Sequence, residues 1–135
     1  MAGHPLSLFE ISGRAMSAQL VRLNTTASNL ANAGTVSGSE QGAFRSLKPV
    51  FRTVMGENGT STVAIDQIVS SPAAPTKRHD PSHPLADSNG DVWEAAVDSA
   101  AEMVEMLETS RQYQNNVQVL QTAKGLMLET LRLGQ

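Results

Sequence analysis

Apolar residues recur every seven positions near the start of the chain, and others lie four positions beyond members of this row. In an α-helix, these spacings place the side chains on one face. The face comprises Phe9, Met16, Leu20, Leu23, Ala27 and Leu30. The pattern predicts a helix from about Ser7 to residues 32–34, where Gly34 can adopt the left-handed conformation that ends many helices.

A second pair of apolar rows with the same period runs through the last forty or so residues. It predicts a helix from about Trp93 to Leu133, roughly 60 Å long at about 1.5 Å per residue. Ser110 and Lys124 interrupt the rows. A repeat of seven is typical of helices that lie along other helices, so we expect these rows to be covered by partner helices. Their apolar members are Met103, Met106, Tyr113, Val117, Leu120, Met127 and Leu131.

The middle of the chain has a different pattern. Residues 44–69 alternate as paired strands do, and residues 56–59 (Gly-Glu-Asn-Gly) favour a tight turn, which predicts a β-hairpin. Four prolines between Ser70 and Pro84 disfavour helix and central strand, so this segment is expected to be an extended, exposed excursion. Residues 87–91 predict a turn before the second helix.

These elements predict a mainly α fold, in which long N- and C-terminal helices pair as an antiparallel coiled coil around a small β-hairpin and extended insertion. The expected divisions are residues 1–34, 35–92 and 93–135. Aromatic residues make up only 4% of the chain, so its own core is expected to be thin. We therefore expect the helices to become rigid against neighbouring copies or partners.

Charge and composition exclude several functions. A formal net charge of −3 provides no basic field for nucleic acid, and the absence of cysteine excludes disulfides and thiolate metal sites. Residues 1–12 carry no lysine or arginine before their short apolar stretch, and no apolar run reaches membrane-spanning length. We therefore expect neither a cleavable signal peptide nor a transmembrane segment.

An acidic strip follows one side of the second predicted helix. Its members are Glu94, Asp98, Glu102 and Glu105. In an antiparallel pair this strip would lie beside residues 24–32, which contain no basic residue, so it is expected to lack an internal counter-charge. Two interpretations stay open: a solvated face suited to the N-terminal half of a helix, or a surface that docks onto a basic neighbour.

No combination of residues indicates catalysis or a cofactor. One cluster contains residue types that bind zinc: His79, Asp80, His83 and Asp87. Prolines between these residues disfavour the helix that would hold the two histidines together. Residues 87–91 lack the glycine that a calcium loop requires at its sixth position. Neither a nucleophile elbow nor a phosphate-binding loop is present. We therefore expect no enzymatic activity, no cofactor and no small-molecule substrate; a zinc-dependent hydrolase is the least favoured alternative.

Two strings stand out in the predicted helices. The first ends the N-terminal helix and consists of Ser28, Asn29, Leu30, Ala31 and Asn32, and the second lies in the C-terminal helix and contains Arg111, Tyr113, Asn115 and Asn116. Together with the segments 43–51 and 83–92, these strings resemble the bacterial flagellar rod and hook family, and the likeness is greatest to subunits of the proximal rod. The chain departs from the family at residues 93–97, where Glu94-Ala95-Ala96 replaces a Met-Pro-Asn-Val-like segment and is expected to let the helix begin earlier.

The resemblance implies a structural subunit of the proximal rod of the flagellar basal body. Its terminal helices would stack with those of other subunits into a tube through which later flagellar proteins are exported. Implied partners are copies of the chain, other proximal and distal rod proteins and the export-gate adaptor at the rod base, with peptidoglycan as a further candidate. The implied location is the periplasmic rod, reached through the flagellar type III apparatus without signal cleavage.

Two features leave alternatives open. Several side-chain amides can both donate and accept hydrogen bonds, so they suit either contacts between subunits or local caps and solvated positions. They belong to Asn29, Asn32, Gln114, Asn115 and Asn116. The helical pattern alone also fits a soluble coiled-coil adaptor of a secretion apparatus, with the Pro-rich segment as a ligand.

Overall fold

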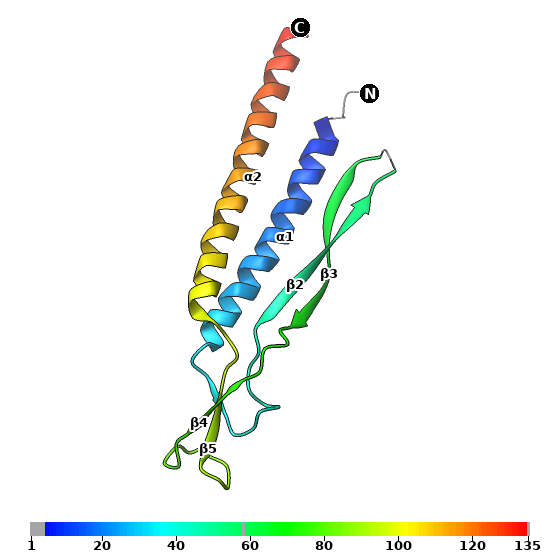
Figure 1. The fold of residues 1–135 in the computed structure, drawn as a ribbon. Coiled ribbons are helices and arrows are strands. Elements are labelled where there is room, and N and C mark those ends of the chain that lie inside the picture. The colour runs from blue at the N-terminus through cyan, green and yellow to red at the C-terminus, as the bar shows by residue number, and fades with distance from the viewer. Residues whose placement is uncertain (1–4, 58, 135) are drawn as a thin grey trace.

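Two long helices and two small antiparallel sheets make up the computed structural model, which describes residues 5–57 and 59–134. Helix α1 (Pro5–Asn32) and helix α2 (Ser99–Leu133) lie side by side and run in opposite directions (Figure 1). At about 1.5 Å per residue, α1 spans about 42 Å and α2 about 52 Å. The predicted first helix is thus confirmed, and it ends at Asn32 as expected.

The first sheet is the predicted hairpin, which lies along α1 on the side away from α2 (Figure 1). Strands β2 (Leu47–Met55) and β3 (Ser61–Ser70) pair antiparallel, with an irregularity between Val50 and Phe51. At the end of the hairpin, the Gly56 N–H donates to the Thr60 carbonyl at 2.7 Å. Both strands contact α1, so the helix has α2 on one side and the hairpin on another.

The second sheet joins segments that are far apart in the sequence. Strand β5 (Asp91–Glu94) is its centre, with β1 (Val36–Ser37) on one side and β4 (Thr76–His79) on the other, all antiparallel. Val92 on the central strand is completely buried. Two further contacts connect this sheet to the segments between the helices and the hairpin. Arg45 and Ala96 form a parallel bridge, and the Ala95 N–H donates a hydrogen bond to the Thr35 carbonyl.

The predicted fold class is wrong. Roughly half of the chain is helical and about a quarter lies in strands, so the molecule is not a mainly α coiled coil with an insertion. Residues 36–37, at the start of the supposed insertion, pair with residues 93–94, which were predicted to begin the second helix. Because their backbone groups are satisfied by this long-range pairing, the middle of the chain is an integral α+β part of the fold.

The predicted start of the second helix is also wrong. Trp93 pairs with Ser37 and Lys77 as part of β5, and the helix begins only at Ser99. The carboxylate of Asp98 accepts a hydrogen bond from Ala101 N–H at 3.2 Å, so Asp98 is the N-cap. Sheet pairing therefore overrides the helical periodicity of residues 93–97, although an aspartate before an apolar run is an N-cap signal in the sequence.

The Pro-rich segment is only partly as expected. It is largely exposed, but residues 76–79 form the paired strand β4. Pro75 and Pro81 lie outside the strand, where they remove no ladder hydrogen bond. The turn at residues 87–91 is confirmed: Asp87 Oδ1 accepts hydrogen bonds from the N–H groups of Asn89 and Asp91, both at 2.9 Å.

The chain buries little apolar surface of its own. Within the described residues, the buried hydrophobic side chains are Ala18, Ala43 and Val92, while sixteen large apolar side chains are exposed. None of the helices in residues 5–57 and 59–134 combines the length and apolar character needed to cross a membrane. The packed centre between α1, α2 and the hairpin is accordingly rich in small and polar side chains.

Candidate assembly interface

The predicted helix rows divide into partly covered and exposed positions. Leu20, Met103 and Leu131 are 44%, 59% and 62% exposed, and Ala27 is exposed as well. The remaining row members are half-buried: Phe9, Met16, Leu23, Leu30, Met106, Tyr113, Val117, Leu120 and Met127. The structure thus covers one row on each helix partially and leaves other apolar positions facing solvent.

Several of the most buried side chains on the two helices are polar, and the sequence analysis missed them. Thr109 on α2 is completely buried, and Thr25 and Thr26 on α1 are nearly so. The hydroxyls of Thr25 and Thr109 each donate at 2.7 Å to a carbonyl four residues earlier, Val21 and Glu105 respectively. Because their own helices satisfy these hydroxyls, such small residues can line the interior without unpaired polar groups. No apolar periodicity signals them.

Asn29, in the first family-like string, has a structural task within the chain. It is only 1% exposed, its Nδ2 donates to the Leu47 carbonyl at 2.9 Å, and its Oδ1 accepts from the Leu47 N–H at 2.8 Å. This double hydrogen bond attaches the first residue of β2 to the last turns of α1. Asn32 instead donates to the Ser28 carbonyl within the helix. The Asn29 amide is therefore occupied internally, whereas Arg111 and Asn115 of the second string are exposed.

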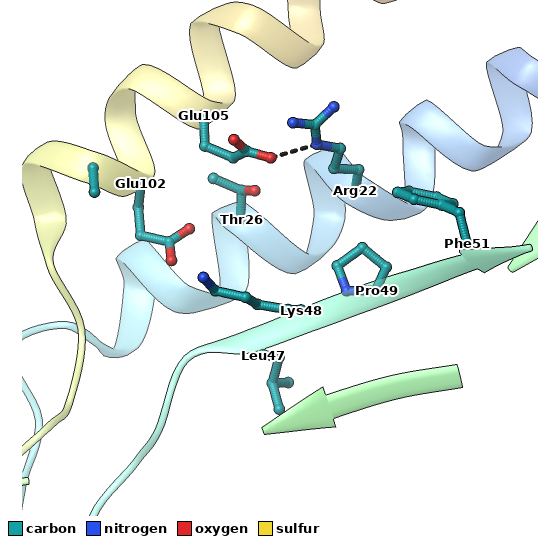
Figure 2. Close-up of a pocket in the computed structure, with 9 residues that line it drawn as sticks. Arg22, Thr26, Leu47, Lys48, Pro49, Phe51, Glu102 and Glu105 are labelled. Atoms are coloured by element: carbon teal, nitrogen blue, oxygen red, sulfur yellow. Dashed lines mark hydrogen bonds and ion pairs between the residues drawn. The ribbon is translucent and has the colours of Figure 1, made fainter. Parts of the chain in front are cut away.

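Two of the four members of the acidic strip have internal counter-charges, contrary to expectation. Glu105 forms an ion pair with Arg22 of α1 (Figure 2). Arg22 also donates a hydrogen bond to Gln112 Oε1. Glu94 lies in β5 and pairs with Arg78 at 2.7 Å, while Asp98 caps α2. The prediction failed because the register of the helices brings Arg22 level with Glu105, and residue spacing does not determine that register.

Helix α2 presents apolar side chains on more of its surface than α1 covers. Met103, Val104 and Leu107 are 59%, 63% and 70% exposed, and their spacing places them on one outward face. At the other end of α2, further leucines border a groove of about 420 Å³ that Leu8 and Phe9 of α1 line together with Leu126 and Met127. Exposed apolar area of this extent is typical of a surface that another chain covers.

The histidine and aspartate cluster belongs to the small sheet. His79 Nδ1 lies 2.9 Å from Asp91 Oδ1, and His83 Nδ1 accepts from the Leu85 N–H at 3.0 Å. In the part of the chain that the structure describes, no three histidine, aspartate or glutamate side chains are arranged to hold a metal ion. These side chains therefore support the sheet and its loops.

Acid is expected to weaken this sheet through Asp91. The hydrogen bond to His79 lowers the pKa of Asp91, burial opposes this effect, and the Lys77 ammonium 3.5 Å away lowers the pKa further. A lowered pKa stabilises the fold above the pKa of the unfolded chain, and this contribution is lost as the pH falls through the folded value. Asp91→Asn should therefore lower Tm at neutral pH, and the difference from wild type should vanish at the lowest pH.

Thermal denaturation between pH 7 and pH 2 measures this difference. Asp66→Asn is the matched control, because Asp66 and its partner Arg52 are both more than half exposed and 3.6 Å apart. A Tm difference for Asp91→Asn that stays constant over the whole pH range would contradict the assignment.

Both terminal regions match known families. Residues 9–37 match the model described as "Flagella basal body rod protein", and residues 89–133 match "Flagellar basal body rod FlgEFG protein C-terminal". The helical ends of the chain are thus those of a flagellar rod protein.

Relatives match the whole chain. The "Flagellar basal-body rod protein FlgC" of Yersinia enterocolitica is 46% identical over 132 residues, and proteins with the same name from Escherichia coli O157:H7 and Salmonella typhimurium are 43% and 42% identical. Each alignment covers 96% of this chain and 98% of the relative. The chain therefore belongs to the FlgC family of flagellar basal-body rod proteins, which confirms the resemblance seen in the sequence. It is a structural subunit of the basal-body rod and belongs to a non-enzymatic family.

Proposed function

We propose that this subunit builds the proximal rod by packing α1 and α2 against the equivalent helices of its neighbours, so that the helices form the wall of the export channel. The single observation that carries this proposal is the balance of apolar surface. Three small or medium hydrophobic side chains are buried in the described chain and sixteen large ones are exposed. Burial of such side chains between subunits contributes favourable free energy to assembly.

In this arrangement the helical pair is the assembly core, built from residues of the divisions 1–34 and 93–135. The division 35–92 provides the hairpin and most of the small sheet. The hairpin lies beside α1, and the small sheet lies beyond the end of α1 and the start of α2 (Figure 1). Neighbours are copies of the chain, other proximal and distal rod proteins and the export-gate adaptor at the rod base, and peptidoglycan lies within the reach of the outer parts. The subunit reaches the rod through the flagellar type III apparatus without loss of a signal peptide.

Crosslinking in intact basal bodies tests this arrangement. A photo-crosslinking phenylalanine analogue replaces Leu131 in one strain and Thr53 of β2, also exposed, in a second. We expect position 131 to give covalent adducts with rod subunits at several times the yield of position 53, because the end of α2 is covered in the rod. Equal yields from the two positions, in basal bodies that contain normal amounts of the chain, would overturn the proposal.

A further inference from the structure

The turn that precedes β5 contains an Asn-Gly pair, Asn89 and Gly90. Gly90 has a φ of +77°, and its N–H donates to the Asp87 carbonyl at 3.0 Å, which closes the turn. Asn89 is exposed, and its side-chain amide forms no hydrogen bond with another group among the described residues. The amide carbon of Asn89 is therefore accessible to chemical attack.

An Asn-Gly pair can react with itself, because glycine has no side chain to hinder its backbone nitrogen. The Gly90 nitrogen attacks Cγ of Asn89, so that a bond forms between these two atoms and the bond from Cγ to Nδ2 breaks. The proton of the Gly90 N–H leaves with the Nδ2 group as ammonia, and a cyclic succinimide remains. Water then opens either of the two carbonyl–nitrogen bonds of this ring, which leaves aspartate or isoaspartate at position 89.

The folded turn opposes this attack. The Gly90 nitrogen must give up its hydrogen bond to the Asp87 carbonyl and rotate toward the Asn89 side chain. Asp87 Oδ1 holds the same backbone by accepting from the N–H groups of Asn89 and Asp91, both at 2.9 Å. Pro81 also lies close to Gly90, since a Cβ added to this glycine would be 3.0 Å from Pro81 Cγ. The turn must therefore open locally before the reaction can proceed.

We propose that Asn89 is a site of spontaneous deamidation whose rate is controlled by the turn at residues 87–90. While the turn is closed, its hydrogen bonds keep the Gly90 nitrogen away from the Asn89 side chain, and the amide persists. When the small sheet opens, the pair reacts as it would in an unstructured peptide. The extent of modification therefore records how often this part of the chain has opened.

The reaction should prevent the turn from closing again. Isoaspartate carries the main chain through its side-chain carbon, so one extra methylene separates position 89 from Gly90. This displaces the Gly90 carbonyl, which accepts from the Asp80 N–H at 2.9 Å. The new carboxylate also lies in a turn that already holds the carboxylates of Asp87 and Asp91. Because like charges this close repel one another, modified chains should have a lower Tm than unmodified chains.

Peptide mapping by mass spectrometry tests the proposal on the full chain. The folded protein and the protein in urea are incubated at neutral pH, and the converted fraction of Asn89 is followed, with isoaspartate detected by an isoaspartyl methyltransferase. We expect conversion at Asn89 to be at least about tenfold faster in urea, because the hydrogen bonds that hold the turn are lost. The Asn-Gly pair at residues 58–59 is an internal reference, because both pairs should convert at similar rates in the urea-unfolded chain.

Two substitutions of Asp87 test the turn itself. Asp87→Ala removes the side-chain acceptor of two hydrogen bonds, so conversion at Asn89 in the folded chain should rise at least about fivefold. Asp87→Asn keeps a side-chain oxygen that can accept both hydrogen bonds, so its rate should stay close to that of wild type. Neither variant should alter the rate in urea, and both should keep the circular dichroism signal of α1 and α2.

Three results would overturn the proposal. Equal rates at Asn89 in the folded chain and in urea would show that the turn gives no protection, and a lack of conversion in urea would show that the pair is unreactive. A wild-type rate for the folded Asp87→Ala chain would exclude control by the turn. The first two results need no variant, so they decide the matter even where Asp87→Ala fails to fold. None of the three depends on contact between subunits, so the proposed function is tested separately.

Discussion

Asn29→Ala should lower the free energy of unfolding by about 2–5 kcal/mol, because it leaves two backbone groups without hydrogen-bond partners. The amide of Asn29 is the hydrogen-bond partner of both the N–H and the carbonyl of Leu47. Each buried backbone group left without a partner costs about 1–3 kcal/mol. The alanine also removes the attachment of the hairpin to α1, so the hairpin should become more protease-sensitive and incorporation into rods should fall.

Urea denaturation followed by circular dichroism measures this effect, with Asn32→Ala as the matched control. The Asn32 amide makes one hydrogen bond, to a carbonyl of its own helix, and its loss should cost less than about 1 kcal/mol. Asn29→Asp should also destabilise the chain, because a carboxylate cannot donate to the Leu47 carbonyl. Similar stabilities for Asn29→Ala and Asn32→Ala would show that the double hydrogen bond does not anchor β2.

Leu107→Asp should leave the free chain folded and yet abolish assembly. Leu107 is 70% exposed, so the change should alter the free energy of unfolding by less than about 0.5 kcal/mol. The proposed packing places a neighbour over the outward face of α2 in the rod, where a carboxylate buried without a partner costs several kcal/mol. We expect incorporation into basal bodies to fall by at least about 100-fold, with loss of swimming motility.

Leu107→Met is the control for this experiment, because it keeps an apolar side chain of similar volume and should support normal motility. Full motility of the Leu107→Asp strain would refute coverage of this face. A fall in Tm of the purified Leu107→Asp chain would instead indicate that the side chain is needed for the fold.

The two changes separate folding from assembly. Asn29 acts inside the subunit, where its amide joins helix to hairpin, and Leu107 acts only when a neighbour arrives. The first should lower both stability and incorporation, the second incorporation alone. A family-like string can therefore owe a residue such as Asn29 to the architecture of the subunit, whereas the proposal assigns contacts between subunits to exposed residues outside the strings.

Local patterns in the sequence determined much of this protein. The seven-residue row and the residues around Gly34 identified α1 and its end, alternation and a glycine-rich turn identified the hairpin, and the two terminal strings identified the family. Each of these features depends on neighbours within about one helical turn or one tight turn, where side-chain spacing reports the backbone conformation directly.

Only the tertiary structure decided the features that depend on distant partners. Residues 93–94 lie in a strand because residues 36–37 and 76–77 pair with them, although their own spacing fits a helix. The Arg22–Glu105 ion pair and the attachment of Asn29 to Leu47 depend on the register of α1 against α2 and β2. Periodicity shows which face of an element is apolar, but long-range backbone pairing and the fit of whole surfaces determine what that face meets.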